Sequence, residues 1–425
     1  MEPFQYQAYT SLLNRELVSA LGCTEPIAVA FAAARARELL GEDALAMELG
    51  CSGNIIKNVM GVVVPNSGGM KGADAAAVLG MLTGDSSRGL EVLQGVTPGM
   101  PERAKELLGS GFCSLSLVPG VENLFIDVRL SSSSHTARVV IRDRHSNIVR
   151  MEKDGEVLLD KPREEGFSGA CGDPEKALLN VKDILIYADT VDLAEIREVI
   201  GRQVLQNCAI SDEGLSHHYG ADVGQTLLKV YGDDVKVRAR ARAAAGSDAR
   251  MGGCSLPVVI NSGSGNQGMT VSLPVIEFAR ELGAGEERLF RSLAVSNLVA
   301  IHQKKYIGSL SAYCGAVSAA CGAGAGITYL CGGGYEEVCA TITNTIANVG
   351  GIVCDGAKPS CAAKIASAVD AAIMAHYMGR SHKTFAPGDG LVQKDVEGTI
   401  ESIGRVGREG MRSTDEEILN IMIGR

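Results

Sequence analysis

The stretch Tyr306–Cys361 opens with YIGSLSAYCGAVSAACGAGAGITYLCGGGY, and this opening part, residues 306–335, contains no charged residue. After Glu336 and Glu337 the uncharged sequence resumes and continues to Cys354. Glycine, alanine, serine and cysteine dominate it, and small residues of this kind allow helices to pack closely. We therefore expect a buried pair of helices here, with the rest of the chain organised around it.

Six of the twelve cysteines lie in this stretch: Cys314, Cys321, Cys331, Cys339, Cys354 and Cys361. The last two bracket the hexapeptide DGAKPS, which is not helical throughout because Pro359 bars the preceding turn and Gly356 weakens it. Thiolates that converge from a helix and a loop can form a metal or iron–sulfur site. Any single cysteine is more often a small core residue, but the loop pair is poorly placed for core packing.

The composition limits the classes of protein to consider. A chain of 425 residues predicts two structural units with ample core, and a net charge of −10 without a long basic run argues against a nucleic-acid partner. The short basic segment Lys236–Arg242 is typical of a solvated helix or strand face. Residues 306–335 are long enough to span a membrane but too rich in glycine and serine, so we expect no membrane span. The N-terminus shows no secretory signal, and sparse cysteines fit the reducing cytoplasm.

Residues 112–160 differ in character from the rest. They alternate apolar and polar residues and are rich in β-branched side chains, and Asp154-Gly155 predicts a hairpin turn. Helices are expected from Pro174 and from Asp192. The predicted fold class is α+β. A mainly helical catalytic domain is built from residues 1–110 and 195–425, and a small α+β domain, residues 111–194, is inserted between its two parts.

The segment GCTEP places Cys23 immediately before a predicted helix, with Thr24 as its N-cap, Pro26 in its first turn and Gly41 at its end. The helix dipole and the free amides of a helix N-terminus favour a thiolate, so we expect a lowered pKa and a reactive Cys23. The alternative is a partly buried thiol without a role.

Glycine-rich turns that lead into helices can hold a carboxylate through backbone amides. Such turns occur in VVVPNSGGMKG and NSGSGNQG, and CSGNIIKN supplies further polar groups. The candidate substrate-binding residues are polar or glycine residues of these three segments and one lysine of HQKKY: Ser52, Asn54, Lys57, Asn66, Ser67, Gly68, Gly69, Asn261, Ser262, Ser264, Asn266 and Lys304. For His217, His218 and His302 we favour a structural role over substrate contact.

With GCTEP, PNSGGMKG, NSGSGNQG, HQKKYIG and the three cysteines Cys314, Cys354 and Cys361, the chain resembles the L-cysteine desulfidase family over essentially its whole length. That family is related to the alpha chain of iron–sulfur L-serine dehydratases. The resemblance implies a mainly helical catalytic domain and a [4Fe–4S] cluster held by these three cysteines. It also implies an essential Cys23 and conversion of L-cysteine to pyruvate, ammonia and hydrogen sulfide without pyridoxal phosphate.

Several alternatives stay open. The same site could act on L-serine or another β-substituted amino acid, or an iron–sulfur protein could be a sensor without turnover. A pyridoxal-phosphate lyase would use a lysine such as Lys57, Lys71 or Lys304, and nothing specific in the sequence supports it. Because two-fold oligomers are common, we expect a homodimer.

Overall fold

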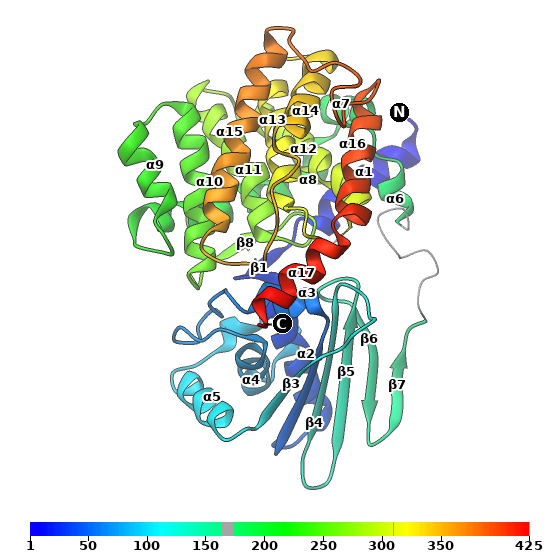
Figure 1. The fold of residues 1–425 in the computed structure, drawn as a ribbon, viewed down its shortest axis with the longest axis vertical. Coiled ribbons are helices and arrows are strands. Elements are labelled where there is room, and N and C mark those ends of the chain that lie inside the picture. Colours follow the sequence, from blue (N-terminus) through cyan, green and yellow to red (C-terminus); the bar gives the residue numbers. More distant parts are fainter. Residues whose placement is uncertain (163–172, 309, 425) are drawn as a thin grey trace.

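The structure is a computed structural model that describes residues 1–162, 173–308 and 310–424, so that Cys171 lies outside the described residues. Its apolar side chains fall mainly into two hydrophobic clusters, one in a mainly helical region and one beneath a sheet (Figure 1). We call these regions the helical unit (residues 1–20 and 173–405) and the α/β unit (residues 21–160). A cavity of about 830 Å³ lies where they meet.

The α/β unit is built on a six-stranded sheet with the strand order β3-β2-β4-β5-β6-β7. Its strands are β2 (Ala46–Cys51), β3 (Cys113–Leu117), β4 (Phe125–Ser131), β5 (Thr136–Arg142), β6 (Ile148–Lys153) and β7 (Glu156–Asp160). Its helices are α2 (Thr24–Leu40), α3 (Gly53–Val59), α4 (Ala73–Thr83), the 3-10 helix η1 (Ser86–Gly95) and α5 (Met100–Gly109). Apolar side chains of α2 and α4 form one core with the inward-facing residues of the sheet.

The strands predicted between residues 112 and 160 are present. Side chains of β4 alternate between buried and exposed positions, as expected for a sheet covered on one face. Asp154 and Gly155 both have positive φ, 53° and 83°, which is the backbone of a tight hairpin turn. Helices also begin where expected, at Pro174 and directly after Asp192, whose side chain caps the helix.

The predicted boundaries between the two domains differ from the structure. Residues 24–109 pack under the sheet and not with the helical unit, because β2 pairs in parallel with β3 and antiparallel with β4. At the other boundary, residues 174–190 belong to the helical core and not to the α+β domain. Strand pairing between distant segments moved both boundaries, and local sequence pattern carries no information about such pairing.

The helical unit contains the expected buried helices. Its elements are α1 (Pro3–Glu16), β1 (Ser19–Leu21), α6 (Pro174–Ala177), α7 (Val181–Thr190), α8 (Leu193–Ser216), α9 (Val223–Tyr231), α10 (Val235–Met251), β8 (Pro257–Val259), α11 (Gly265–Glu281), α12 (Glu286–Ile307), α13 (Gly315–Leu330), α14 (Tyr335–Val349), α15 (Cys361–Arg380) and α16 (Val396–Arg405). The chain ends with the π-turn η2 (Val406–Gly410) and α17 (Arg412–Met422).

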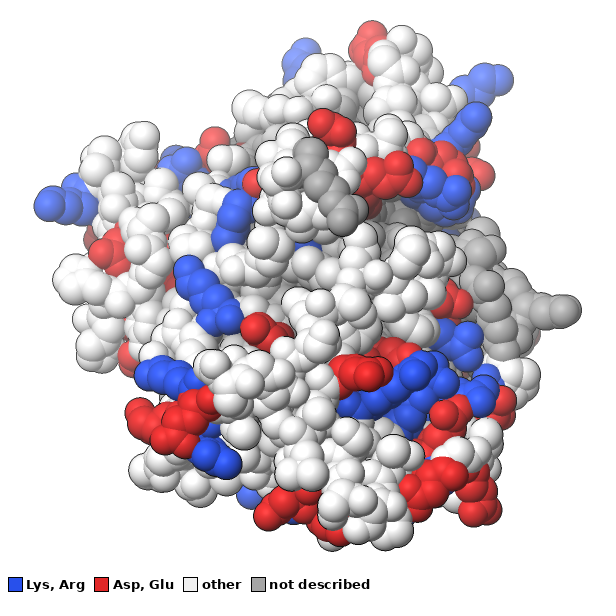
Figure 2. Space-filling model, turned by 60° about the horizontal axis from the view of Figure 1, so that its bottom comes forward, with Lys and Arg blue, Asp and Glu red and all other residues white. Residues whose placement is uncertain are grey.

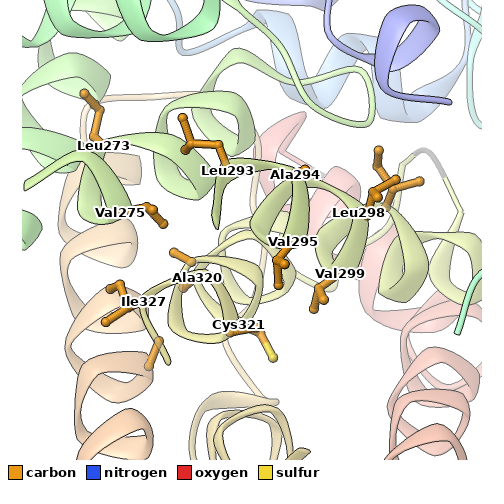
Figure 3. Packing of buried hydrophobic residues seen from close by; sticks show 14 of the residues in the cluster. Leu273, Val275, Leu293, Ala294, Val295, Leu298, Val299, Ala320, Cys321 and Ile327 are labelled. Carbon is orange, nitrogen blue, oxygen red and sulfur yellow. The ribbon is translucent and has the colours of Figure 1, made fainter. Parts of the chain in front are cut away.

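The helix α13 packs closely against α12 because it presents glycines to it. A Cβ at Gly322 would collide with the Ser296 carbonyl oxygen, and one at Gly326 would come within 2.9 Å of the Ser292 carbonyl oxygen. Figure 3 shows side chains of α11, α12 and α13 meeting in this core, with Cys321 among them. Cys331 and Cys339 are partly buried against the same core, so all three cysteines pack there.

The two units meet through several elements from distant parts of the chain. Strand β1, which pairs antiparallel with β8 in the helical unit, leads directly into α2 of the α/β unit, and α17 lies beside α3 between the units (Figure 1). Figure 2 shows basic side chains next to acidic ones on the face turned toward the viewer. The basic segment of α10 is also ion-paired, for example Arg238 with Glu281 and Arg240 with Asp370. Within the described residues, no helix is long and apolar enough to cross a membrane.

Candidate active site

Two of the proposed cluster ligands are held side by side by backbone pairing. The Cys354 N–H donates to the Ala312 carbonyl oxygen (2.6 Å), and the Cys314 N–H donates to the Ile352 carbonyl oxygen (3.1 Å). Cys314 is then the N-cap of α13. As a result, the thiol of Cys314 hydrogen-bonds to the sulfur of Cys354.

The third cysteine, Cys361, opens α15 at the end of the DGAKPS loop. Gly356 turns the loop with a φ of +92°, and a Cβ there would collide with the Lys57 carbonyl oxygen of α3. The loop therefore needs glycine at this position for two reasons, its conformation and its close approach to α3. Cys361 interacts electrostatically with both other cysteines, so the thiols at the start of α13 and around the DGAKPS loop share one neighbourhood.

Two lysines, each ion-paired with an aspartate, lie near the cysteines. The hydrogen bond from Cys314, together with the charges of Lys57 and Lys364, lowers the pKa of Cys354. Burial raises the pKa of Cys361. Within the described part of the chain, no His, Cys, Asp and Glu side chains form a group of three or more suited to a metal ion. A polynuclear iron–sulfur cluster binds each cysteine through a different iron, so its thiolates need not surround one point.

Cys23 lies in a different chemical setting from the one that its position at a helix start predicts. It is the N-cap of α2 and only 2% exposed, and its thiol donates a hydrogen bond to Glu25 Oε2 at 2.9 Å. Burial and the charge of Glu25 raise the pKa of Cys23, and they outweigh the nearby charge of Arg250. The expected lowering of this pKa is therefore wrong, because desolvation and a like charge exceed the helix dipole. Cys361 packs against the small apolar cluster to which Cys23 belongs.

Glu25 is the centre of a buried polar group that the sequence analysis missed. Its Oε2 accepts hydrogen bonds from Cys23 and from the Thr24 hydroxyl (3.2 Å), and its Oε1 accepts one from Asn58 Nδ2 (3.1 Å). His145 Nε2 lies 3.9 Å from Oε1. Burial would raise the pKa of Glu25, but His145 and the Cys23 thiol lower it to about 2. The sequence offered one signal for this polar group, the carboxylate of Glu25 beside the proline of GCTEP. It offered no signal for His145.

A cavity of about 830 Å³ lies between the two units and is lined by residues of both. Five of the predicted substrate-binding residues line it: Ser52, Asn54, Lys57, Ser262 and Lys304. His145 also lines the cavity, and its Nε2 is buried without a hydrogen-bond partner among the described residues. His145 and Glu25 therefore lie between the cavity and Cys23, which does not itself line the cavity.

Four lysines of the described chain line the cavity, and the two of them predicted from the sequence, Lys57 and Lys304, differ in their partners. Lys57 is 1% exposed and forms an ion pair with Asp415 of α17. Lys304 is 6% exposed, and burial lowers its pKa to about 8 although the nearby Cys354 and Cys314 raise it. The described part of the chain supplies Lys304 with no ion pair, so Lys304 is the better placed of the two for a substrate carboxylate.

The loop with Asn66, Ser67, Gly68 and Gly69 does not line the cavity. Asn66 Nδ2 donates a hydrogen bond to the Leu93 carbonyl oxygen, and the Ser67 hydroxyl donates one to the Met70 carbonyl oxygen. Both side chains therefore stabilise the conformation of this loop. Pro65 of the same loop packs against Gly22, where a Cβ would collide with its ring. The loop thus supports the turn before Cys23.

The second glycine-rich turn is only partly exposed to the cavity. Asn261 is buried and donates to Asn297 Oδ1 (2.9 Å), while Ser264 pairs with it through backbone atoms. Gly263, which lines the cavity, accepts a hydrogen bond from Thr24. Asn266 Oδ1 is buried with no hydrogen-bond partner in the described structure.

The histidines considered from sequence have separate surroundings. His302 is fully buried and hydrogen-bonded to Glu397 through Nε2 (2.6 Å). His217 and His218 are exposed and lie beside Glu213 and Asp222. None of the three lines the cavity.

Comparison with known proteins adds an independent observation. A family model described as "Serine dehydratase alpha chain" matches residues 87–420. A UPF0597 protein of Lachnoclostridium phytofermentans is 52% identical, over 98% of this chain and 100% of its own length. UPF0597 proteins of Desulfitobacterium hafniense and Treponema denticola are 49% and 48% identical, over 98% and 100% of this chain and 97% and 99% of their own lengths.

Proposed function

Because the chain belongs to the serine dehydratase alpha chain family, we propose that it is an iron–sulfur lyase of β-substituted amino acids that converts L-cysteine to pyruvate, ammonia and hydrogen sulfide. The observation that carries the proposal is the proximity of the three cysteines to one another and to Lys57 and Lys304, which are buried and line the cavity. The reducing cytoplasm suits such a cluster.

The three cysteines fit a [4Fe–4S] cluster by their donor chemistry. They are soft thiol ligands, and Lys57 and Lys364 lie close enough to offset the negative charge of the thiolates. When bound, such a cluster supplies a Lewis-acidic iron with affinity for sulfur.

The cavity offers groups of the right kind for an α-amino acid. The Lys304 ammonium would hold the carboxylate as an ion pair, in a site dry enough for that attraction to be strong. Asn54 Oδ1 is buried without a hydrogen-bond partner among the described residues and can accept from the substrate ammonium. The Ser262 hydroxyl, on the opposite unit, can complete the contact. Contacts from both units would fix the Cα–H bond in one direction.

The pair of Cys23 and Glu25 supplies proton transfer. In the resting protein the proton is on sulfur and the carboxylate is charged. Transfer of this proton from Sγ to Oε2 of Glu25 is uphill, because the pKa of the carboxyl is about 2 and that of the thiol is raised, so the thiolate forms only transiently. The thiolate then takes the proton from Cα as the substituent at Cβ departs with its bonding electrons. The free 2-aminoacrylate isomerises to an imine, and water hydrolyses it to pyruvate and ammonia.

L-serine is the second candidate, because the matching family model carries the name of serine dehydratase. Iron held by three soft cysteine thiolates would have more affinity for the sulfide that leaves L-cysteine than for the hydroxide that leaves L-serine, which favours L-cysteine. The cavity volume of about 830 Å³ is large enough for either amino acid and for longer β-substituted ones.

The test begins with protein reconstituted anaerobically with iron and sulfide. We expect iron and acid-labile sulfide near four per chain, a broad absorbance near 400 nm, and pyruvate and sulfide in equal amounts from L-cysteine. Pyruvate from L-serine alone would make the protein a serine dehydratase. A cluster without turnover of either amino acid would make it a sensor, and activity that depends on added pyridoxal phosphate would contradict the proposal.

A further inference from the structure

Asp415, close to the C-terminus in α17, touches two segments that carry candidate site residues. One carboxylate oxygen pairs with the Lys57 ammonium of α3, and the other accepts the Ala312 backbone N–H at 2.8 Å. Lys57 is almost completely buried, so this carboxylate is its counter-charge inside the protein.

The contacts of Asp415 belong to a closed ring of contacts that includes Cys354. The Ala312 carbonyl oxygen accepts the Cys354 N–H. Gly356, two residues after Cys354, packs directly on the Lys57 carbonyl oxygen. Lys57, Asp415, Ala312 and the segment from Cys354 to Gly356 therefore support one another, and each link joins parts of the chain that are distant in sequence.

The ring also forms part of the cavity wall. Asp415 lines the cavity together with Arg412, Glu416 and Leu419 of the same helix. The Leu419 side chain covers Gly53, where a Cβ would come within 2.5 Å of Leu419 Cδ2. Figure 1 shows α17 beside α3, between the helical unit and the α/β unit. Helix α17 is thus part of the cavity wall. Among the ion pairs of the described residues, the pair of Asp415 and Lys57 is the only buried one that joins α17 to α3.

We propose that Asp415 is a positioning residue of the active site, which holds the Lys57 ammonium beside the cysteines and fixes the peptide that precedes Cys314. The cluster and the activity invoked in its test rest on the proposed function, whereas the ring of contacts does not. Without the carboxylate, Lys57 is left buried without a counter-charge and the Ala312 N–H loses its acceptor. The segment around Lys57 and the segment that precedes Cys314 are then free to shift relative to each other.

The first test compares Asp415→Asn with the wild type after iron reconstitution. We expect the absorbance near 400 nm to decay about tenfold faster in air and kcat/KM for L-cysteine to fall about tenfold, an effect of the size of one lost positioning contact. Asp415→Glu, which keeps the charge, should recover part of both. Glu417→Gln is the matched control, because Glu417 is exposed on the same helix and does not line the cavity. Wild-type decay and kcat/KM in Asp415→Asn would overturn the proposal.

A second test separates positioning from a general loss of stability. If Asp415 acts through Lys57, then Asp415→Asn should change kcat/KM much less in a Lys57→Met background than in the wild type. Equal effects in both backgrounds would show that Asp415 does not act through this lysine. Circular dichroism of all variants checks that each is folded.

A third test does not depend on the lyase activity or on iron. In the iron-free full-length protein, alkylation of Cys354 by N-ethylmaleimide is followed by peptide mass spectrometry, with buried Cys321 as an internal reference. We expect faster labelling of Cys354 in Asp415→Asn but not in Glu417→Gln, and equal labelling would contradict the proposal. A wild type that binds iron but makes no pyruvate would refute the proposed lyase, and this test would still decide on Asp415.

Discussion

The Cys23 thiol donates a hydrogen bond to the carboxylate of Glu25, 2.9 Å away, at the buried start of α2. The opposite oxygen of that carboxylate is bound by Asn58 and lies 3.9 Å from His145, which lines the cavity. A base that sits in such a pair is protonated at rest, so its chemistry depends on the neighbour that accepts its proton. The pair, and not the thiol alone, is therefore the unit that the following experiments address.

Cys23→Ser should separate catalysis from cluster binding. We expect it to keep the iron content of the wild type, because Cys314, Cys354 and Cys361 are unchanged, and to lose most of its pyruvate formation, because a serine hydroxyl is a far weaker acid than a thiol. Iron analysis and a pyruvate assay measure the two properties. Turnover close to that of the wild type would show that another group is the base.

Glu25→Gln keeps the size of the side chain but removes the group that can take the thiol proton. We expect kcat for L-cysteine to fall about 100-fold with little change in KM, the size typical of a lost acid–base partner. Glu106→Gln, on the exposed surface of α5, is the control. A rise in KM alone would assign Glu25 to substrate binding instead.

Cys321 offers a control within the stretch that contains the proposed ligands. It is fully buried in the core between α12 and α13, so Cys321→Ala should lower the free energy of unfolding by about 1 kcal/mol and leave the iron content intact. Cys354→Ala should lose most of its iron under the same reconstitution. Equal iron loss in the two variants would contradict the ligand assignment.

Gly356→Ala tests the close approach of the DGAKPS loop to α3. Alanine at a φ of +92° is strained, and its Cβ would meet a backbone oxygen that cannot move aside. We expect a loss of about 2 kcal/mol in the free energy of unfolding and reduced iron retention. Gly351→Ala is the matched control, since nothing lies within 4 Å of its Cβ position. Urea unfolding of the iron-free proteins gives the comparison, and equal stability of the two variants would show that the loop adapts.

His376 should make the protein sensitive to acid. Burial lowers its pKa from 6.5 to about 4, while its Nδ1 lies 2.8 Å from the Thr328 hydroxyl. Because the folded-state pKa lies below the unfolded one, the neutral ring contributes stability above pH 6.5 that is lost as the pH falls toward 4. This difference between the folded-state and unfolded-state pKa corresponds to about 3 kcal/mol in the free energy of unfolding. Urea unfolding of the iron-free wild type and of His376→Asn should show their stabilities converging by about this amount between pH 7.5 and pH 4. Parallel curves would contradict it.

The sequence by itself determined the features that depend on neighbouring residues. Alternation between residues 112 and 160, the turn at Asp154-Gly155 and the capped start after Asp192 all appeared as predicted, because local backbone preference and side-chain period act over a few residues. The uncharged, glycine-rich stretch predicted buried helices for the same reason, since only small residues allow α13 to approach α12 so closely.

Only the tertiary structure decided what depends on contacts between distant segments. The pairing of β2 with β3 and β4 transferred residues 24–109 to the α/β unit, and burial beside Glu25 reversed the expected ionisation of Cys23. Asp415 met Lys57 only because α17 folds back between the units. Strand partners, desolvation and counter-charges are set by what surrounds a residue in space, and one sequence does not contain that arrangement in its local pattern.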